Sequence, residues 1–190
     1  MRKTTKPVPK TFILPIKENE TDAVYQMFQD IPAEENGATN HANGMNRAEF
    51  NEFCKKMNEH SIEKANGKKE FPGSDKIPQT LYIISNNNGY PVGFGKFRPY
   101  LNEACIRNRA GHFAYMIHPD FRGMGFATAF LLFVLNQAQS MGLSEVEGTA
   151  LKENKVSRHL MKKNGGIFCR EKSIDGDAVY KFILNGKTRS

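Results

Sequence analysis

Cysteine is scarce in this chain, and its spacing does not suit cross-links. Cys54, Cys105 and Cys169 are the only three in 190 residues, their number is odd, and no two follow the Cys-x-x-Cys pattern. A disulfide framework or a cysteine-based zinc site needs paired, closely spaced residues. We therefore expect reduced thiols and no metal site.

Long apolar segments are missing as well. The longest run of large apolar side chains, 130–135, is far shorter than the roughly 18 residues of a membrane span. The basic start, 1–10, has no apolar core after it and so lacks the pattern of a secretory signal. These absences predict a cytoplasmic protein without membrane association.

Length and composition predict one domain. Hydrophobic residues make up 39% of the chain and charged residues 25%, which is typical of a globular protein, and 190 residues can enclose one substantial core. We expect a basic N-terminal extension over 1–10 and a single domain over 11–190.

The net charge of +7 raises the question of nucleic-acid binding. The lysines and arginines are spread along the chain, and the known nucleic-acid motifs are missing. A basic nucleic-acid-binding domain is therefore the less favoured alternative, and it would require an affinity that falls steeply with salt.

Two nucleotide-binding fingerprints are also missing, but a glycine-rich turn is present. The chain has neither Gly-x-Gly-x-x-Gly nor a Gly-Lys-Ser/Thr P-loop. Instead, residues 118–127, His-Pro-Asp-Phe-Arg-Gly-Met-Gly-Phe-Ala, join a predicted strand over 112–117 to a predicted helix over 128–141. Glycines let the backbone approach an anion, and the first helical N–H groups point at it. The turn is predicted to bind phosphate, although an ordinary strand-to-helix turn also fits the glycine spacing.

The remaining patterns predict a mixed α/β domain. The clearest is a hairpin of strands 81–85 and 91–97 around Asn-Gly, where Gly93 and Gly95 indicate a bulge or a close backbone approach. Segments 33–46 and 98–110 are expected to be irregular, and 66–79 to be a long surface connection. Further predicted strands cover 12–16, 144–150, 167–169 and 178–184, and further helices cover about 22–28, 47–64 and 154–163.

This order, with Arg-x-x-Gly-x-Ala after the fourth strand, resembles the GNAT N-acetyltransferase superfamily and its acyl-CoA pyrophosphate loop. The similarity covers about 10–185, is most specific over 90–166, and points to a subgroup of bacterial predicted acetyltransferases. It implies an α/β (α+β) acyl-CoA N-acyltransferase domain with a mixed, mostly antiparallel central sheet of about six to seven strands and about four flanking helices. The fourth and fifth strands, 112–117 and 144–150, should splay apart.

The resemblance also implies acetyl-CoA as cofactor, with CoA as product, and assigns residues to it. The backbone of the fourth strand would pair with the pantetheine arm, the amides of the glycine turn would hold the pyrophosphate with two side chains at its edge, and the next helix would lie near the reactive end. The strand residues are Met116, Ile117 and His118. The turn residues are Gly123, Met124, Gly125, Phe126 and Ala127, with the side chains of Arg122 and Thr128 at the edge. The helix residues are Asn154 and Ser157.

In the implied reaction a primary amine attacks the acetyl thioester directly in a ternary complex, and a backbone N–H stabilises the oxyanion. An amine with a pKa of about 10 must lose a proton near neutral pH. Glu147 and His112 are the candidate bases, although a solvated Glu and a merely hydrogen-bonded His are equally good interpretations. Glu103, Glu145 and His118 stay open as alternatives.

One position departs from the family pattern. Many relatives have a tyrosine as general acid where this chain has Met161, which cannot donate a proton. Tyr115 is the candidate replacement, with His159, water or unassisted departure of the thiolate as alternatives.

Met161 also motivates a second hypothesis, a catalytically silent acyl-CoA-binding module. The expected acceptor is a small-molecule or peptide amine, and an acetyl or a longer acyl group is compatible with the sequence. A homodimer is compatible with the resemblance, because relatives are often dimers.

Overall fold

Two antiparallel sheets form the centre of the fold. A computed structural model of the chain describes residues 7–68, 77–108, 110–171 and 178–184. One antiparallel sheet has the order β1-β4-β5-β6, formed by β1 (Phe12–Pro15), β4 (Thr80–Ser85), β5 (Pro91–Phe97) and β6 (Phe113–Ile117). The second has the order β7-β9-β8, formed by β7 (Glu145–Ala150), β8 (Ile167–Glu171) and β9 (Ala178–Ile183). This agrees with the predicted fold class.

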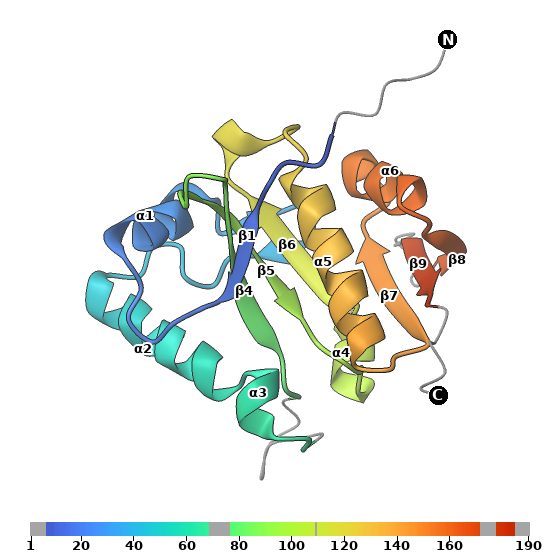
Figure 1. Cartoon of the computed structure of the whole chain (residues 1–190), viewed down its shortest axis with the longest axis horizontal. Helices are drawn as coiled ribbons and strands as arrows, with labels where there is room; N and C mark the ends of the chain where they lie inside the picture. The colour runs from blue at the N-terminus through green and yellow to red at the C-terminus, as the bar shows by residue number, and fades with distance from the viewer. Residues whose placement is uncertain (1–6, 69–76, 109, 172–177, 185–190) are drawn as a thin grey trace.

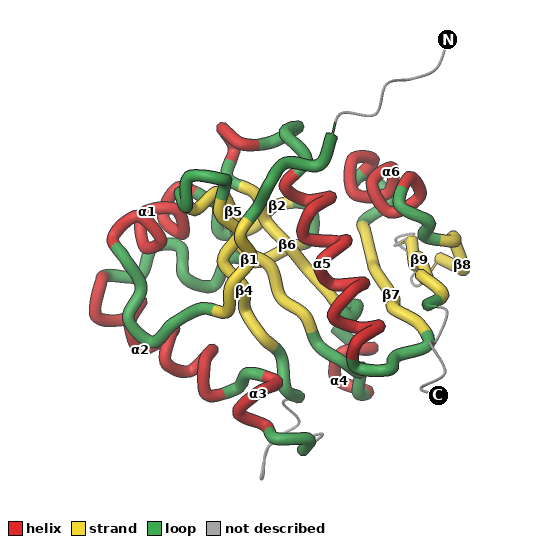
Figure 2. Tube along the Cα trace, viewed as in Figure 1, coloured by secondary structure: helices red, strands yellow, loops and turns green. Residues whose placement is uncertain are grey.

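Helices cover the sheets on both sides, as Figures 1 and 2 show. The four longer ones are α1 (Asp22–Asp30), α2 (Arg47–Glu59), α5 (Phe126–Ser140) and α6 (Lys155–Lys163), close to the predicted positions. Two short ones, α3 (Ile62–Ala65) and α4 (Glu103–Arg107), were not predicted as separate helices. No helix in the described ranges is long and apolar enough to cross a bilayer.

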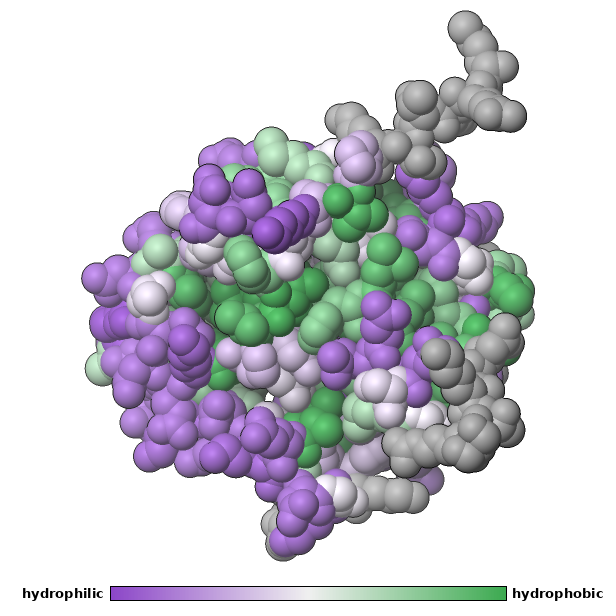
Figure 3. Space-filling view, viewed as in Figure 1, coloured by the Kyte–Doolittle hydropathy of each residue, from purple (hydrophilic) through white to green (hydrophobic). Residues whose placement is uncertain are grey.

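Two apolar clusters hold the layers together. The first lies between α1, α2 and the four-stranded sheet, where Phe28 stacks on Phe94 with ring centroids 4.5 Å apart. The second joins α5 and α6 to both sheets and includes the buried side chains of Phe130, Met161 and Tyr180. Each face of the four-stranded sheet is thus covered by its own set of helices, while Figure 3 shows hydrophilic surface over α1 and α2.

Three segments differ from the structure predicted for them. Segment 33–46 contains a small hairpin, β2 (Glu34–Glu35) and β3 (Ala38–Thr39), and 98–110 contains α4. The helix expected over 47–64 stops at Glu59, because Ser61 caps a new turn by accepting a hydrogen bond from the Lys64 N–H. Within the predicted connection 66–79, residues 69–76 lie outside the described residues, as does the predicted turn 174–177.

The two sheets meet at one end of β6 and β7. The N–H of His112 donates to the carbonyl of Glu147 over 2.8 Å, and a Cβ on Gly111 would lie only 2.6 Å from that carbonyl oxygen. Because α5 crosses from the end of β6 to the start of β7, both strands run in the same direction (Figure 1). Beyond this contact they belong to different sheets, as predicted for the fourth and fifth strands.

Gly95 permits the close packing of α5 on β5. A Cβ at this position would lie 2.3 Å from Cζ of the fully buried Phe130. This confirms the close approach predicted from the glycines of the hairpin.

The variant Gly95→Ala should therefore be less stable by about 1–3 kcal/mol, because the added methyl overpacks the core. Equilibrium unfolding in urea measures the change. Combining it with Phe130→Leu should give a loss smaller than the sum of the two single losses, since the smaller side chain makes room. Strict additivity would contradict the close contact.

Candidate functional site

The glycine turn ends in a helix that has no side-chain cap. After β6, a short 3₁₀ turn (Pro119–Phe121) leads to Gly123 and Gly125, whose φ angles of +71° and +93° favour glycine. Gly125 is the N-cap of α5, and no side chain in the described part of the chain accepts from the first amides of that helix. The first amides of α5 thus lie at the positive end of a helix dipole, where anions bind favourably.

Arg122 forms an ion pair within the protein. Its two terminal nitrogens donate to the carboxylate of Glu35 over 2.9 and 2.6 Å, and its Nε donates to the carbonyl of Ile117 over 3.1 Å. The guanidinium thus ties the glycine turn to the β2–β3 hairpin. These three bonds use three of the five guanidinium N–H groups, so two donors are left for a further acceptor.

A local signal for this hairpin was present in the sequence. Asn36 and Gly37 have φ angles of +52° and +79°, which are the values that an Asn-Gly pair supplies to a two-residue hairpin turn. No local sequence pattern predicts that Glu35 pairs with Arg122, because the two residues are 87 positions apart.

The N-terminal segment passes over the same turn. A Cβ on Gly125 would lie 2.8 Å from Cδ of Pro9, whereas a Cβ on Gly123 would meet nothing within 4 Å. Among the described residues, the turn is thus approached by residues 7–9 at Gly125 and by no atom within 4 Å of a Cβ at Gly123.

The predicted pantetheine residues lie on a strand with one free flank. Ile117 and Met116 pair with Gly93 and Phe94 of β5 along one edge of β6, and the other edge faces β7 of the second sheet. The side chain of His118 forms a local hydrogen bond, in which its Nδ1 accepts from the N–H of Asp120 over 3.2 Å. An extended ligand can pair only with the flank that faces β7.

Tyr115 and the predicted α6 residues meet across the gap between the sheets. Asn154 caps α6 by accepting from the Ser157 N–H over 3.0 Å, and the Ser157 hydroxyl lies 3.0 Å from that of Tyr115. Burial raises the pKa of Tyr115, and the hydrogen bond with Ser157 opposes this only in part. The phenol stays protonated near neutral pH, as a proton donor must. Met161, by contrast, is buried in the core.

His112 and Glu147 are brought together at the contact between the sheets. Nδ1 of His112 accepts the N–H of Glu147 over 3.0 Å, so the proton of the neutral ring is on Nε2. Burial lowers the pKa of His112, while the neighbouring Glu147 opposes the shift. The neutral ring has no lone pair left for a substrate proton, whereas the carboxylate of Glu147 is chemically able to accept one.

These two residues line a cavity of about 500 Å³ at the closed end of the gap. Of the other predicted alternatives, Glu145 pairs with Lys181 over 2.6 Å and Glu103 pairs with Arg107 over 3.7 Å. The cavity is lined by Pro99, Tyr100, Leu101, His112, Gly142, Leu143, Ser144, Glu145 and Glu147.

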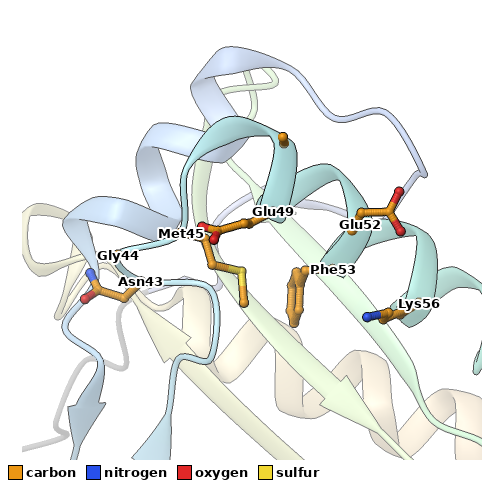
Figure 4. A pocket seen from close by; sticks show the side chains of 8 residues that line it. Asn43, Gly44, Met45, Glu49, Glu52, Phe53 and Lys56 are labelled. Atoms are coloured by element: carbon orange, nitrogen blue, oxygen red, sulfur yellow. The ribbon is translucent and has the colours of Figure 1, made fainter.

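A larger cavity, of about 680 Å³, lies elsewhere (Figure 4). Its wall is formed by 43–45 and by one side of α2, including Glu52, Phe53 and Lys56. None of the predicted site residues lines it, so size alone does not mark the site.

The described part of the chain contains no arrangement of side chains suited to a metal ion. No group of three or more His, Cys, Asp or Glu residues there is arranged to hold a metal ion. Burial raises the pKa of Cys54 to about 12, so this thiol stays protonated.

The buried state of His112 predicts a pH dependence of stability. Because its folded pKa lies below the unfolded value of 6.5, the unfolded chain binds a proton first as the pH falls through 6.5, and the free energy of unfolding decreases. In His112→Asn, whose amide oxygen can accept the same N–H, the loss of stability between pH 7.5 and 5.5 should be smaller than in the parent. Urea unfolding at both pH values measures this, and equal losses would show that His112 is not held neutral.

The structure resembles solved acetyltransferases over nearly its whole length. An N-acetyltransferase from Staphylococcus aureus Mu50 has a TM-score of 0.61 at 14% identity, covering 93% of this chain and 99% of that one. A Salmonella typhimurium acetyltransferase that modifies the N-terminal serine of a 50S ribosomal subunit protein has a TM-score of 0.60 at 15% identity, covering 95% and 99%. The microcin C7 self-immunity acetyltransferase MccE, solved with acetyl-CoA and AMP, has a TM-score of 0.60 at 13% identity, covering 92% of each.

Identities this low establish a shared fold. No curated protein sequence matches the chain. The family model of the acetyltransferase (GNAT) domain matches residues 11–167, which include the gap between the sheets, the glycine turn and the start of α6. The chain belongs to the GNAT acetyltransferase domain family.

Proposed function

We propose that this chain is an acetyl-CoA-dependent N-acetyltransferase that moves an acetyl group to a primary amine by direct attack in a ternary complex. One observation carries the proposal: the uncapped start of α5 and the free flank of β6 lie at the same gap between two sheets. A diphosphate fits the first and an extended amide-bearing arm fits the second. Acetyl-CoA contains both groups and supplies the activated acetyl thioester.

The chain's own residues then have separate tasks. The amides of 123–127 hold the diphosphate, and the flank of β6 at 116–118 aligns the arm. A backbone N–H on the same flank stabilises the oxyanion. Asn154 and Ser157, at the start of α6, border the reactive end from the other side of the gap.

Glu147 is the proposed general base. His112 was an equal candidate in the sequence, but its Nδ1 already accepts the Glu147 N–H. We therefore assign His112 a positioning role, in which it fixes β7 beside β6. Tyr115, whose pKa is raised by burial, is the proposed donor to the leaving thiolate.

A silent acyl-CoA-binding module is the second candidate. It is favoured by the burial of Met161, which leaves no proton donor at the position where many relatives have tyrosine. Turnover of any amine excludes it. The cytoplasmic location and the homodimer stay predictions from the sequence.

Acetyl-CoA should stabilise the folded chain. At a concentration 100 times its Kd, a ligand adds about 2.7 kcal/mol to the free energy of unfolding, which is a readily measured shift in melting temperature. Thermal unfolding with acetyl-CoA, CoA and NAD should show a shift for the first two ligands and none for NAD. Indifference to saturating acetyl-CoA would remove the basis of the proposal.

Glu147→Gln should lower kcat by about 10²–10⁴-fold, since the amide cannot accept the amine proton. Glu145→Gln is the matched control, because Glu145 lies two residues earlier on the same strand and pairs with Lys181. Release of free CoA in the presence of a panel of amines measures the rates. If both variants retain the parental rate while acetyl-CoA still raises their melting temperatures, Glu147 is not the general base.

A further inference from the structure

Lys96 is placed within the four-stranded sheet. On β5 its cross-strand neighbours are Leu81 and Ala114. Two residues earlier on the same face, Phe94 stacks on Phe28 of α1, so Lys96 lies on the face that α1 and α2 cover. The side chain is half-buried, and it forms no hydrogen bond or salt bridge with any residue that the structure describes. A partly desolvated ammonium without a counter-charge is unfavourable.

The sheet surface next to Lys96 is exposed to solvent at its neighbour on β6. Ala114, its neighbour on β6, is exposed although it lies in the middle of a strand. His112 lies two residues earlier on the same face, at the contact with Glu147 of β7. Lys96, Ala114 and His112 therefore lie on one face of the four-stranded sheet, and Glu147 adjoins this face at His112.

The surroundings of Lys96 on this face are cationic. Arg98 follows on the same face of β5, where its side chain donates to the Gly111 carbonyl and to Gln79. Burial, and then the charge of Arg98, lower the pKa of Lys96 to about 8. Lys96 in turn contributes to the lowered pKa of His41, for which burial is the larger cause. The side formed by β7 carries Glu147 and Glu145, the second of which pairs with Lys181.

We propose that Lys96 binds a carboxylate of the acceptor, so that the preferred acceptor carries an amine and a carboxylate a few ångströms apart, as an amino acid does. A bound carboxylate would supply the missing counter-charge to Lys96 and leave the amine on the side of Glu147. Neutral and polycationic amines lack the group that Lys96 would bind. The inference rests on the proposed function and names the substrate class of the same site.

Chemical labelling tests the binding step without turnover. A brief pulse of isotopically labelled acetic anhydride at pH 7.5, followed by peptide mass spectrometry, reports how accessible the neutral amine of Lys96 is. The probes are the free amino acids and their carboxamides, presented as matched pairs to the CoA-bound chain. For at least one pair, the acid should slow labelling of Lys96 several-fold more than its amide does, while labelling of the exposed Lys55 is unchanged. Equal protection by acids and amides, or no protection by any acid, overturns the proposal.

Substitution tests the specificity step. For the acid that protects Lys96, Lys96→Met should raise KM at least tenfold with a smaller change in kcat, and Lys96→Arg should retain part of the affinity. Lys55→Met, on the exposed side of α2, is the control. The methionine variant should fold, because an apolar side chain of similar length replaces an unpaired charge; its melting temperature checks this.

Failure of this inference is distinguishable from failure of the proposed function. If acetyl-CoA does not stabilise the chain, the proposed function fails. If acetyl-CoA binds and amines are acetylated, but neutral amines are preferred and Lys96→Met leaves KM unchanged, only the carboxylate assignment fails.

Discussion

The contact between β6 and β7 is the constraint on which the site depends. It holds the two sheets together at one end through the His112 N–H and the Glu147 carbonyl, and Gly111 has no side chain that would keep them apart. The second bond, from the Glu147 N–H to His112, needs a neutral ring, which burial favours. Because the strands touch here and belong to separate sheets beyond, the gap has a closed end where Glu147 lies.

The β2–β3 hairpin connects the two sides of this gap. At one end Glu35 pairs with Arg122, just after β6. At the turn, Gly37 lies so close to Leu151, just after β7, that a Cβ would be 2.9 Å from its Cγ. The hairpin therefore links the glycine turn to the second sheet, through the Arg122–Glu35 pair at one end and the Gly37–Leu151 contact at the other.

Local patterns in the sequence were sufficient for most of the fold. The hairpin of β4 and β5, the strand–turn–helix from β6 to α5, and the order of the later elements follow from periodicity, Asn-Gly and glycine signals. The sequence could not supply the partners of Arg122 and His112, because these pairings join residues 87 and 35 positions apart. It also gave no reason to single out Lys96, which has no counter-charge among the described residues once the sheet is assembled. The binding and catalytic roles of the predicted residues stay predictions.

Amide hydrogen exchange with and without CoA tests the central claim most directly, because the claim assigns the ligand to particular backbone N–H groups. The account predicts slower exchange at 116–118 on β6 and at 123–127 at the start of α5, with little change along α2. Protection confined to 43–56, around the larger cavity, or no protection anywhere in the presence of saturating CoA, would contradict it.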